Sequence, residues 1–204
     1  EKFAREYDLE FITADSTLID SKTLATLNGV EPEFKTGEIR WWERPSPGNV
    51  YLVSLDPSAG IGRDYAAIQV WKLPQLMQVG EWMHNKSSVS QQLKTLVQIC
   101  SYLDKELRAS SYAEPEIYWT FENNSYGQAV IELLNEIGLD VIPATLVNEP
   151  GMVPGKNRRG LNTNGRTKNQ AVTKLKSLLE TNKMLIRSRP LISQLKSYVN
   201  TGGS

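Results

Sequence analysis

The sequence has few residues suited to disulfide or soft-metal chemistry, and it has no long apolar run. Cys100 is the only cysteine among 204 residues, so an intrachain disulfide is excluded and a reducing compartment fits. The only histidine, His84, has no cysteine or histidine neighbour that would make it a typical zinc ligand. Apolar runs of about 18 residues and signal-peptide patterns are absent, so neither a membrane-spanning helix nor a secretion signal is predicted. A Walker A motif is also absent, which excludes a P-loop nucleotide site.

Composition and length indicate a folded α/β domain with unevenly distributed charge. Hydrophobic residues make up 40% of the chain and charged residues 23%, which is enough apolar material for a real core. A length of 204 residues suits one domain, or one domain with an appendage. Residues 1–150 carry 12 basic and 22 acidic side chains, whereas residues 151–204 carry 11 basic side chains and one acidic one. This basic C-terminal part favours a polyanionic partner over a surface that is basic only for solubility.

Residues 51–71 predict a β-hairpin with a carboxylate at the end of its first strand. A mostly apolar run stops at Asp56, because Pro57 cannot donate to a ladder hydrogen bond. A loop of small residues follows and leaves open space beside the acid, and Asp64 falls where the chain re-enters the sheet. A carboxylate facing such a loop suits a hard divalent cation such as Mg²⁺, although a simple Asp-Pro turn would explain Asp56 equally well.

The later segments complete the element order β-β-β-α-β-α-β, which is the order of an RNase H-like fold. After the hairpin, the predicted elements are a strand over 77–84, a helix opened by a Ser88–Gln91 capping box, a strand over 117–122, a helix opened by a Ser125–Gln128 capping box, and a strand over 139–144. We therefore predict an α/β fold with an RNase H-like mixed sheet and flanking helices. In it the first and fourth strands are neighbours, so Asp56 and Glu122 would meet at one sheet end. Two acids that meet in this way favour a cation site. The alternatives are that Asp56 only opens a turn and that Glu122 only interacts with the dipole of the following helix.

Residues 145–168 form a long polar stretch rich in glycine, asparagine and basic side chains. A stretch of this length within a compact domain is usually functional or disordered. Its basic side chains are candidates for contacts with phosphates: Lys156, Arg158, Arg159, Arg166 and Lys168. A helix capped by Thr167 and a short strand over 184–187 are predicted after it.

Two acidic motifs resemble those of a viral enzyme family. The pattern Leu55-Asp-Pro-Ser-Ala-Gly-Ile-Gly-Arg-Asp-Tyr65 resembles the first catalytic motif of the large terminase subunit of tailed bacteriophages. The pattern Tyr118-Trp-Thr-Phe-Glu-Asn-Asn-Ser-Tyr-Gly127 resembles the second. The helix from Gln170 and the segments after it also resemble that family, so the resemblance covers nearly the whole chain. It is strongest to the nuclease of large contractile-tailed phages.

The resemblance implies a metal-dependent, RNase H-like endonuclease that cuts concatemeric viral DNA during packaging. By position, Asp56 and Glu122 would be catalytic metal ligands, and Asp64 would be a supporting catalytic acid. The family's third essential Asp has no match here; we expect it beyond Ser204, in a chain that is C-terminally truncated. Residues 1–48 would connect to a preceding ATPase domain, absent here, and residues 49–204 would form the nuclease domain.

The implied mechanism is two-metal phosphodiester hydrolysis with Mg²⁺ or Mn²⁺. The implied partners are double-stranded DNA, the terminase ATPase domain, the small terminase subunit and the portal, with no membrane. The implied location is the viral procapsid in the host cell cytoplasm. Two alternatives stay open: an RNase H-like resolvase or transposase-type nuclease, and a non-catalytic DNA-docking module. A third, an actin-like phosphotransferase, is disfavoured, because it needs two domains with such a hairpin and this sequence has one hairpin in 204 residues.

Overall fold

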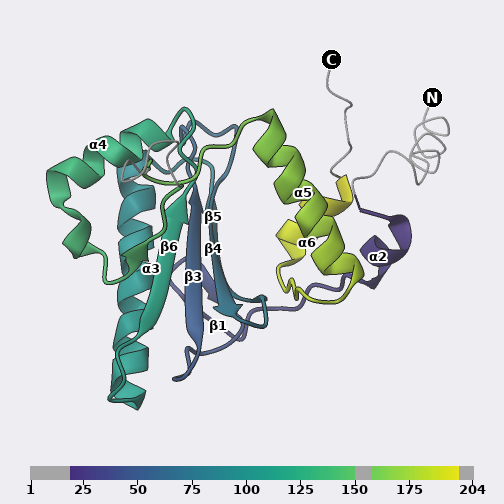
Figure 1. Ribbon diagram of the computed structural model, residues 1–204, viewed down its shortest axis with the longest axis horizontal. Coiled ribbons are helices and arrows are strands. Elements are labelled where there is room, and N and C mark those ends of the chain that lie inside the picture. Colours follow the sequence, from purple (N-terminus) through teal and green to yellow (C-terminus); the bar gives the residue numbers. More distant parts are fainter. Residues whose placement is uncertain (1–18, 150–157, 198–204) are drawn as a thin grey trace.

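The computed structural model describes residues 19–149 and 158–197, which form helices on both faces of one mixed sheet (Figure 1). In chain order the elements are α2 (Ser21–Thr26), β1 (Phe34–Thr36), β2 (Ile39–Trp41), β3 (Val50–Asp56), β4 (Ala66–Leu73), β5 (Met77–His84), α3 (Val89–Ser110), β6 (Glu116–Phe121), α4 (Gly127–Ile137), a 3-10 helix η1 (Leu139–Val141), β7 (Thr145–Leu146), α5 (Gly165–Glu180) and α6 (Arg189–Ser197). The described strands are ordered β1-β2-β5-β4-β3-β6-β7. β3, β4 and β5 pair antiparallel, whereas β6 joins β3 in parallel and β7 joins β6 in parallel. The predicted RNase H-like mixed sheet is confirmed.

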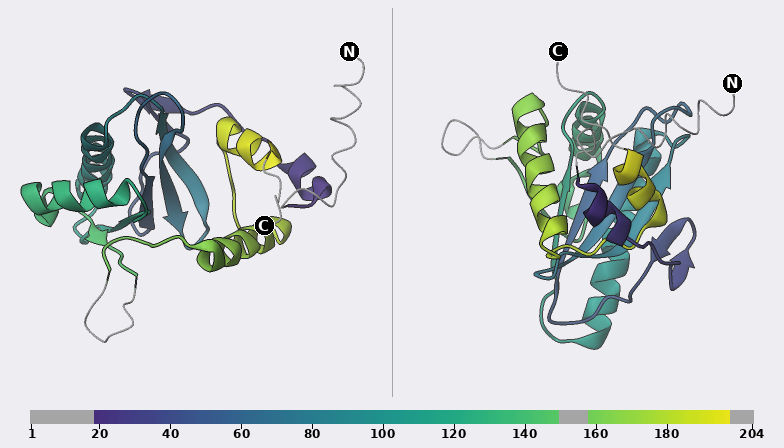
Figure 2. Two further views of the ribbon diagram at one scale, coloured as in Figure 1. Left: turned by 90° about the horizontal axis from the view of Figure 1, so that it is seen from above. Right: turned by 90° about the vertical axis from the view of Figure 1, so that its right-hand side faces the viewer.

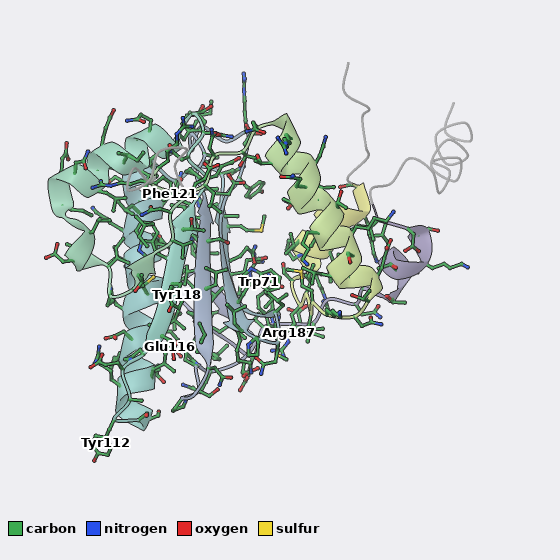
Figure 3. All side chains as sticks on the ribbon, in the orientation of Figure 1. Trp71, Tyr112, Glu116, Tyr118, Phe121 and Arg187 are labelled. Carbon is green, nitrogen blue, oxygen red and sulfur yellow. The ribbon has the colours of Figure 1, made fainter. Side chains whose placement is uncertain are left out.

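The two sheet faces carry separate hydrophobic clusters. α3 and α4 lie on one face, where the apolar stripe of α3, including Cys100, packs on alternate strand residues in the main core (Figures 1 and 2). α2, α5 and α6 lie on the other side (Figure 1), where Trp71, labelled in Figure 3, belongs to a smaller core together with Leu179 and Ile192. Among the described helices, none combines the length and apolar character needed to cross a membrane.

The alternation of β3 decides which helices each of its side chains faces. Tyr51, Val53 and Leu55 are buried in the main core. Leu52, between them, packs against the smaller core on the opposite face. Because side chains alternate with a period of two residues along a strand, Asp56 lies on the same face as Leu52. The carboxylate therefore opens toward the side covered by α6.

The described part of residues 1–48 extends one edge of the sheet. β1 and β2 form an antiparallel hairpin, and β2 pairs antiparallel with β5. Trp41, the last residue of β2, and Trp42, directly after it, are both buried. The division into a connecting segment over 1–48 and a nuclease domain over 49–204 stays a prediction.

Two predicted strands are wrong in extent. Residues 139–144 do not form a strand: Leu139–Val141 is a 3-10 helix, and β7 begins at Thr145. Gly138 leaves α4 with a φ of 85°, and this turn delays the return of the chain to the sheet. The predicted strand over 184–187 is reduced to a single parallel bridge between Met77 and Leu185.

One of the three predicted helix caps is confirmed. Ser88 caps α3 by accepting a hydrogen bond from the backbone N–H of Gln91 at 3.3 Å. Ser125 does not cap α4, which has no side-chain cap. Thr167 is not the cap of α5 but lies inside its first turn. Asn164 caps this helix, and each of the two side chains accepts a hydrogen bond from the other's backbone N–H.

A buried polar network joins the sheet to the start of α6. Glu81 of β5 is fully buried, at 0% exposure, and forms an ion pair with Arg40 of β2. The hydroxyl of Ser188 donates to Oε1 of Glu81 at 2.9 Å, and Nε2 of Gln69 donates to Oε2 at 3.0 Å. Oε1 of Gln78 accepts from the backbone N–H of Ser188 at 2.8 Å. These bonds hold the beginning of α6 against the sheet.

Candidate metal centre

Parallel pairing brings Asp56 and Glu122 to one end of the sheet. The register aligns Leu55 of β3 with Phe121 of β6, and the backbone N–H of Glu122 donates to the carbonyl oxygen of Leu55 at 3.0 Å. Figure 3 labels Glu116 and Phe121, the two ends of β6, and the site follows the Phe121 end. The carboxyl group of Glu122 lies near enough to that of Asp56 to raise the pKa of Asp56. The two acids therefore lie side by side, as the strand order predicts.

Both acids line a pocket of about 440 Å³ between the sheet and α6. One wall consists of strand side chains from the face that carries Asp56, and Leu191 and Gln194 of α6 form part of the opposite wall. The remaining lining residues are Ser54, Leu55, Ala67, Gln69, Met83, Thr120, Phe121, Leu161 and Thr163. The volume lies within the range of roughly 300–1,000 Å³ that is usual for small-molecule sites. The pocket has room for a cation with its water ligands beside the acids.

The surroundings of Asp56 disfavour its charged form. Asp56 reaches solvent, but protein atoms around its carboxyl group displace water, and this partial desolvation is the largest cause that raises its pKa to about 7. The neighbouring Glu122 carboxyl group and the negative charge of Asp64 raise the pKa further. Two adjacent acids that compete for one proton form a site that a divalent cation would neutralise, and their hard oxygen donors fit Mg²⁺ or Mn²⁺.

Asp64 affects this site through its charge, from the exposed loop between β3 and β4. Within residues 19–149 and 158–197, no group of three or more His, Cys, Asp or Glu side chains is placed to hold a metal ion. The described chain thus supplies two adjacent carboxylates, Asp56 and Glu122. Proteins usually hold Mg²⁺ with one or two carboxylates, together with water and substrate oxygens. The supporting role of Asp64 stays a prediction.

A buried glutamine of α3 fixes the loop that follows Asp56. Gln92 is fully buried, at 0% exposure. Its Nε2 donates to the carbonyl oxygen of Ser58 at 2.8 Å, and its Oε1 accepts from the backbone N–H of Ser58 at 3.2 Å. Gly60 has a φ of 68°, and a Cβ there would lie 2.0 Å from the carbonyl oxygen of Ser87. The loop is therefore seated closely on the N-terminal end of α3, and sequence reasoning missed the role of Gln92.

Two asparagines after β6 hold both Glu122 and a distant segment. Nδ2 of Asn124 donates to Oε1 of Glu122 at 3.1 Å and to the carbonyl oxygen of Thr163 at 2.6 Å. Nδ2 of Asn123 donates to the carbonyl oxygen of Arg159 at 2.8 Å. Asn124 thus orients the Glu122 carboxylate and ties it to the chain that leads into α5. The only sequence signal for this arrangement is the pair of amides directly after a strand-ending acid.

Phosphate contacts by the five predicted basic residues stay a prediction, and the structure places four of those residues. Lys156 lies outside the described residues. Arg158 is exposed, and the guanidinium of Arg159 donates to the side chain of an α4 residue at 2.6 Å. Arg166 and Lys168 are exposed near the N-terminal end of α5. The segment that carries Arg159 lies beside the acids, but the Arg159 side chain is engaged with the protein itself.

Without metal, the protein will lose stability as the pH rises from about 4 to about 7. The pKa of Asp56 is raised from 3.8 to about 7 in the folded protein, so between these values the folded state keeps a proton that the unfolded state has lost. Below 3.8 both states are protonated, and above about 7 both are ionised. The stability advantage of Asp56→Asn over the unmodified chain should therefore grow across this window and then level off. Thermal unfolding in chelator from pH 4 to pH 8 measures it; a difference independent of pH would contradict the raised pKa.

Comparison with known proteins identifies the fold. No family model matches the sequence. The crystal structure of the large terminase nuclease from thermophilic phage G20c with bound magnesium aligns with a TM-score of 0.63 at 18% identity, over 92% of this chain and 82% of that chain. The same nuclease with bound zinc aligns with a TM-score of 0.60 at 19% identity, over 89% and 88% of the two chains. The large terminase nuclease domain of Thermus phage P74-26 gives 0.55 at 19% identity, over 85% and 74%. The chain has the fold of phage large terminase nuclease domains.

Proposed function

We propose that this chain is the metal-dependent endonuclease domain of a viral DNA-packaging terminase, which cuts concatemeric double-stranded DNA. The observation that carries the proposal is the pair of carboxylates, Asp56 and Glu122, at the adjoining ends of two parallel strands and in the lining of a pocket. The likeness in fold to terminase nucleases supports it, because crystal structures of one such nuclease contain magnesium, zinc or cobalt.

Asp56 and Glu122 would hold two cations, Mg²⁺ or Mn²⁺, through hard oxygen ligands. Bound there, the cations would supply an activated water molecule and stabilise the leaving oxygen of a phosphodiester. The chain's own residues keep the ligands in place: Asn124 hydrogen-bonds to Glu122, and Gln92 holds the loop after Asp56. Asp64 adds negative charge to the same site, which favours binding of cations.

The proposed substrate and partners follow from the same assignment. Duplex DNA would approach the exposed basic residues on and before α5, including Arg158 and Arg166. Contacts of this kind fix the DNA backbone and carry little sequence information. The terminase ATPase domain, the small terminase subunit and the portal are proposed partners, at the viral procapsid in the host cytoplasm. In such a machine the cut position would be set by assembly rather than by base recognition.

Nicking of supercoiled plasmid tests the proposal. We expect the chain, or a longer form of the protein that contains it, to nick plasmid in Mn²⁺ or Mg²⁺ and to stop when the metal is chelated. The same activity should be lost in Asp56→Ala. Salt-sensitive DNA binding with no cleavage in either metal would instead favour a non-catalytic docking module. A strong preference for branched over linear duplex DNA would favour a resolvase-type nuclease.

A further inference from the structure

One exposed face of α5 forms a shallow groove that is separate from the pocket of Asp56 and Glu122. The groove has a volume of about 670 Å³ and is lined by Arg166, Asn169, Gln170, Thr173, Lys174 and Ser177. Successive lining residues are one or three positions apart, so they form a single stripe along the helix. Leu175 and Leu179 lie on the other face of α5 and pack into the smaller core. The stripe is therefore the solvent side of a helix that is anchored by its apolar side.

Among the described residues, the lining of the groove combines positive charge with neutral hydrogen-bond donors and includes no carboxylate. Arg166 and Lys174 are exposed, and no ion pair with an acid is found for either among the described residues. The only acid of α5, Glu180, lies 3.7 Å from Lys176, and neither residue lines the groove. Its other lining side chains are amides and hydroxyls, which together with Arg and Lys are the groups that contact phosphate and sugar in DNA complexes. No aromatic or aliphatic side chain is among the described residues that line the groove, which disfavours a protein partner.

The N-terminal end of α5 directly follows, along the chain, a residue of the candidate metal centre. Thr163 lines the pocket that contains Asp56 and Glu122, and its backbone N–H donates to Oδ1 of Asn124 at 3.3 Å. α5 begins two residues later, so the stripe runs away from the acids. From Arg166 to Ser177 it extends roughly 16 Å along the helix, the axial rise of about five nucleotides of one DNA strand.

We propose that this face of α5 is a track for the phosphate backbone of the duplex that enters the metal centre. The proposal rests on the proposed function, because it assigns the surface that holds the substrate of that site. Arg166 and Lys174 neutralise phosphates, and the amide and hydroxyl side chains between them donate hydrogen bonds to phosphate oxygens. The positive charges of the track, Arg166 and Lys174, lie on the exposed face of α5. The Arg159 guanidinium is not part of the track, because it donates to a side chain of α4.

Charge reversal on α5 tests the track. Binding of a linear duplex is measured in chelator, so that no cleavage occurs, for the unmodified chain and for Arg166→Glu/Lys174→Glu. The matched control is Lys94→Glu/Lys105→Glu, which makes the same change of charge at two exposed positions of α3, on the other side of the sheet. We expect the α5 pair to abolish measurable binding and the α3 pair to retain most of it. An acid at position 166 lies in the first turn of α5, where the helix dipole favours it, so the α5 pair should keep its fold.

A milder pair of substitutions tests the same proposal through the salt dependence of DNA affinity. Arg166→Gln/Lys174→Gln should lower the slope of log affinity against log salt by about 1.8, because each lost phosphate contact contributes about 0.9. The loss of affinity should be equal for duplexes of different sequence.

Three results would each overturn the track: equal losses of affinity in the α5 and α3 pairs, an unchanged salt slope, or no salt-dependent binding by the unmodified chain. If the unmodified chain cleaves DNA while the α5 pairs bind normally, the track fails and the nuclease assignment stands. If salt-dependent binding follows α5 but no metal supports cleavage, the track stands and the nuclease assignment fails.

Discussion

Asp56→Asn and Glu122→Gln will each lower the rate of metal-dependent DNA cleavage by about a thousand-fold or more. Each change removes one of the two adjacent carboxylates, and so a charge that would hold the cations. A metal ion contributes several kcal/mol to stabilising the transition state, and a loss of about 4 kcal/mol corresponds to about a thousand-fold in rate. Nicking rates at saturating DNA measure the effect, and thermal unfolding checks that both variants are folded.

The comparison requires a matched carboxylate away from the site. Glu136→Gln changes an exposed acid of α4 by the same chemistry and should leave the rate unchanged. Asp64→Asn should lower the rate by less than Asp56→Asn, because Asp64 acts on the site through its charge. If Asp56→Asn and Glu122→Gln both cleave DNA at the normal rate, neither residue belongs to the catalytic centre.

Glu81→Leu will lower the free energy of unfolding by about 3 kcal/mol. Breaking a buried ion pair on one side typically costs about 3–5 kcal/mol, because the remaining charge is left without its partner. We expect the low end because the Arg40 side chain is 25% exposed and can regain some hydration. The change also removes the acceptor of Ser188 and Gln69, and so loosens the start of α6 against the sheet. Urea unfolding measures the loss.

A double-mutant cycle separates the pair from simple loss of polarity. Arg40→Leu/Glu81→Leu removes both charges, and an apolar pair in place of a buried ion pair is often nearly neutral. The double variant should therefore be more stable than Glu81→Leu alone. Free energies of unfolding that simply add across the cycle would mean that the ion pair does not couple these residues.

The local pattern of the sequence was sufficient to predict most strands of the sheet and the meeting of Asp56 with Glu122. The apolar run ending at Asp56 and the run ending at Glu122 each predicted a strand with an acid at its end, and strand lengths were nearly correct. Their meeting required only the order of elements, because right-handed crossovers place the fourth strand beside the first. The parallel register of Leu55 with Phe121 agrees with that reasoning.

The errors occur where tertiary contacts decide local structure. Residues 139–144 include the β-branched Val141 and Ile142, but the 3-10 turn after Gly138 takes up Leu139–Val141, and β7 begins only at Thr145. At α5, the Thr167 signal was real but its partner was Asn164, so the helix begins one turn earlier. The roles of Gln92 and Asn124 depend on partners 34 and 39 residues away, Ser58 and Thr163, which no local pattern identifies.

Anomalous scattering from Mn²⁺ in crystals of the protein tests the central claim most directly. We predict a peak in the anomalous difference map beside the carboxylates of Asp56 and Glu122, and its loss in crystals of Asp56→Asn. If the map shows no peak beside these carboxylates at high Mn²⁺ and a pH above 7, the assignment of this acid pair as a metal centre is wrong.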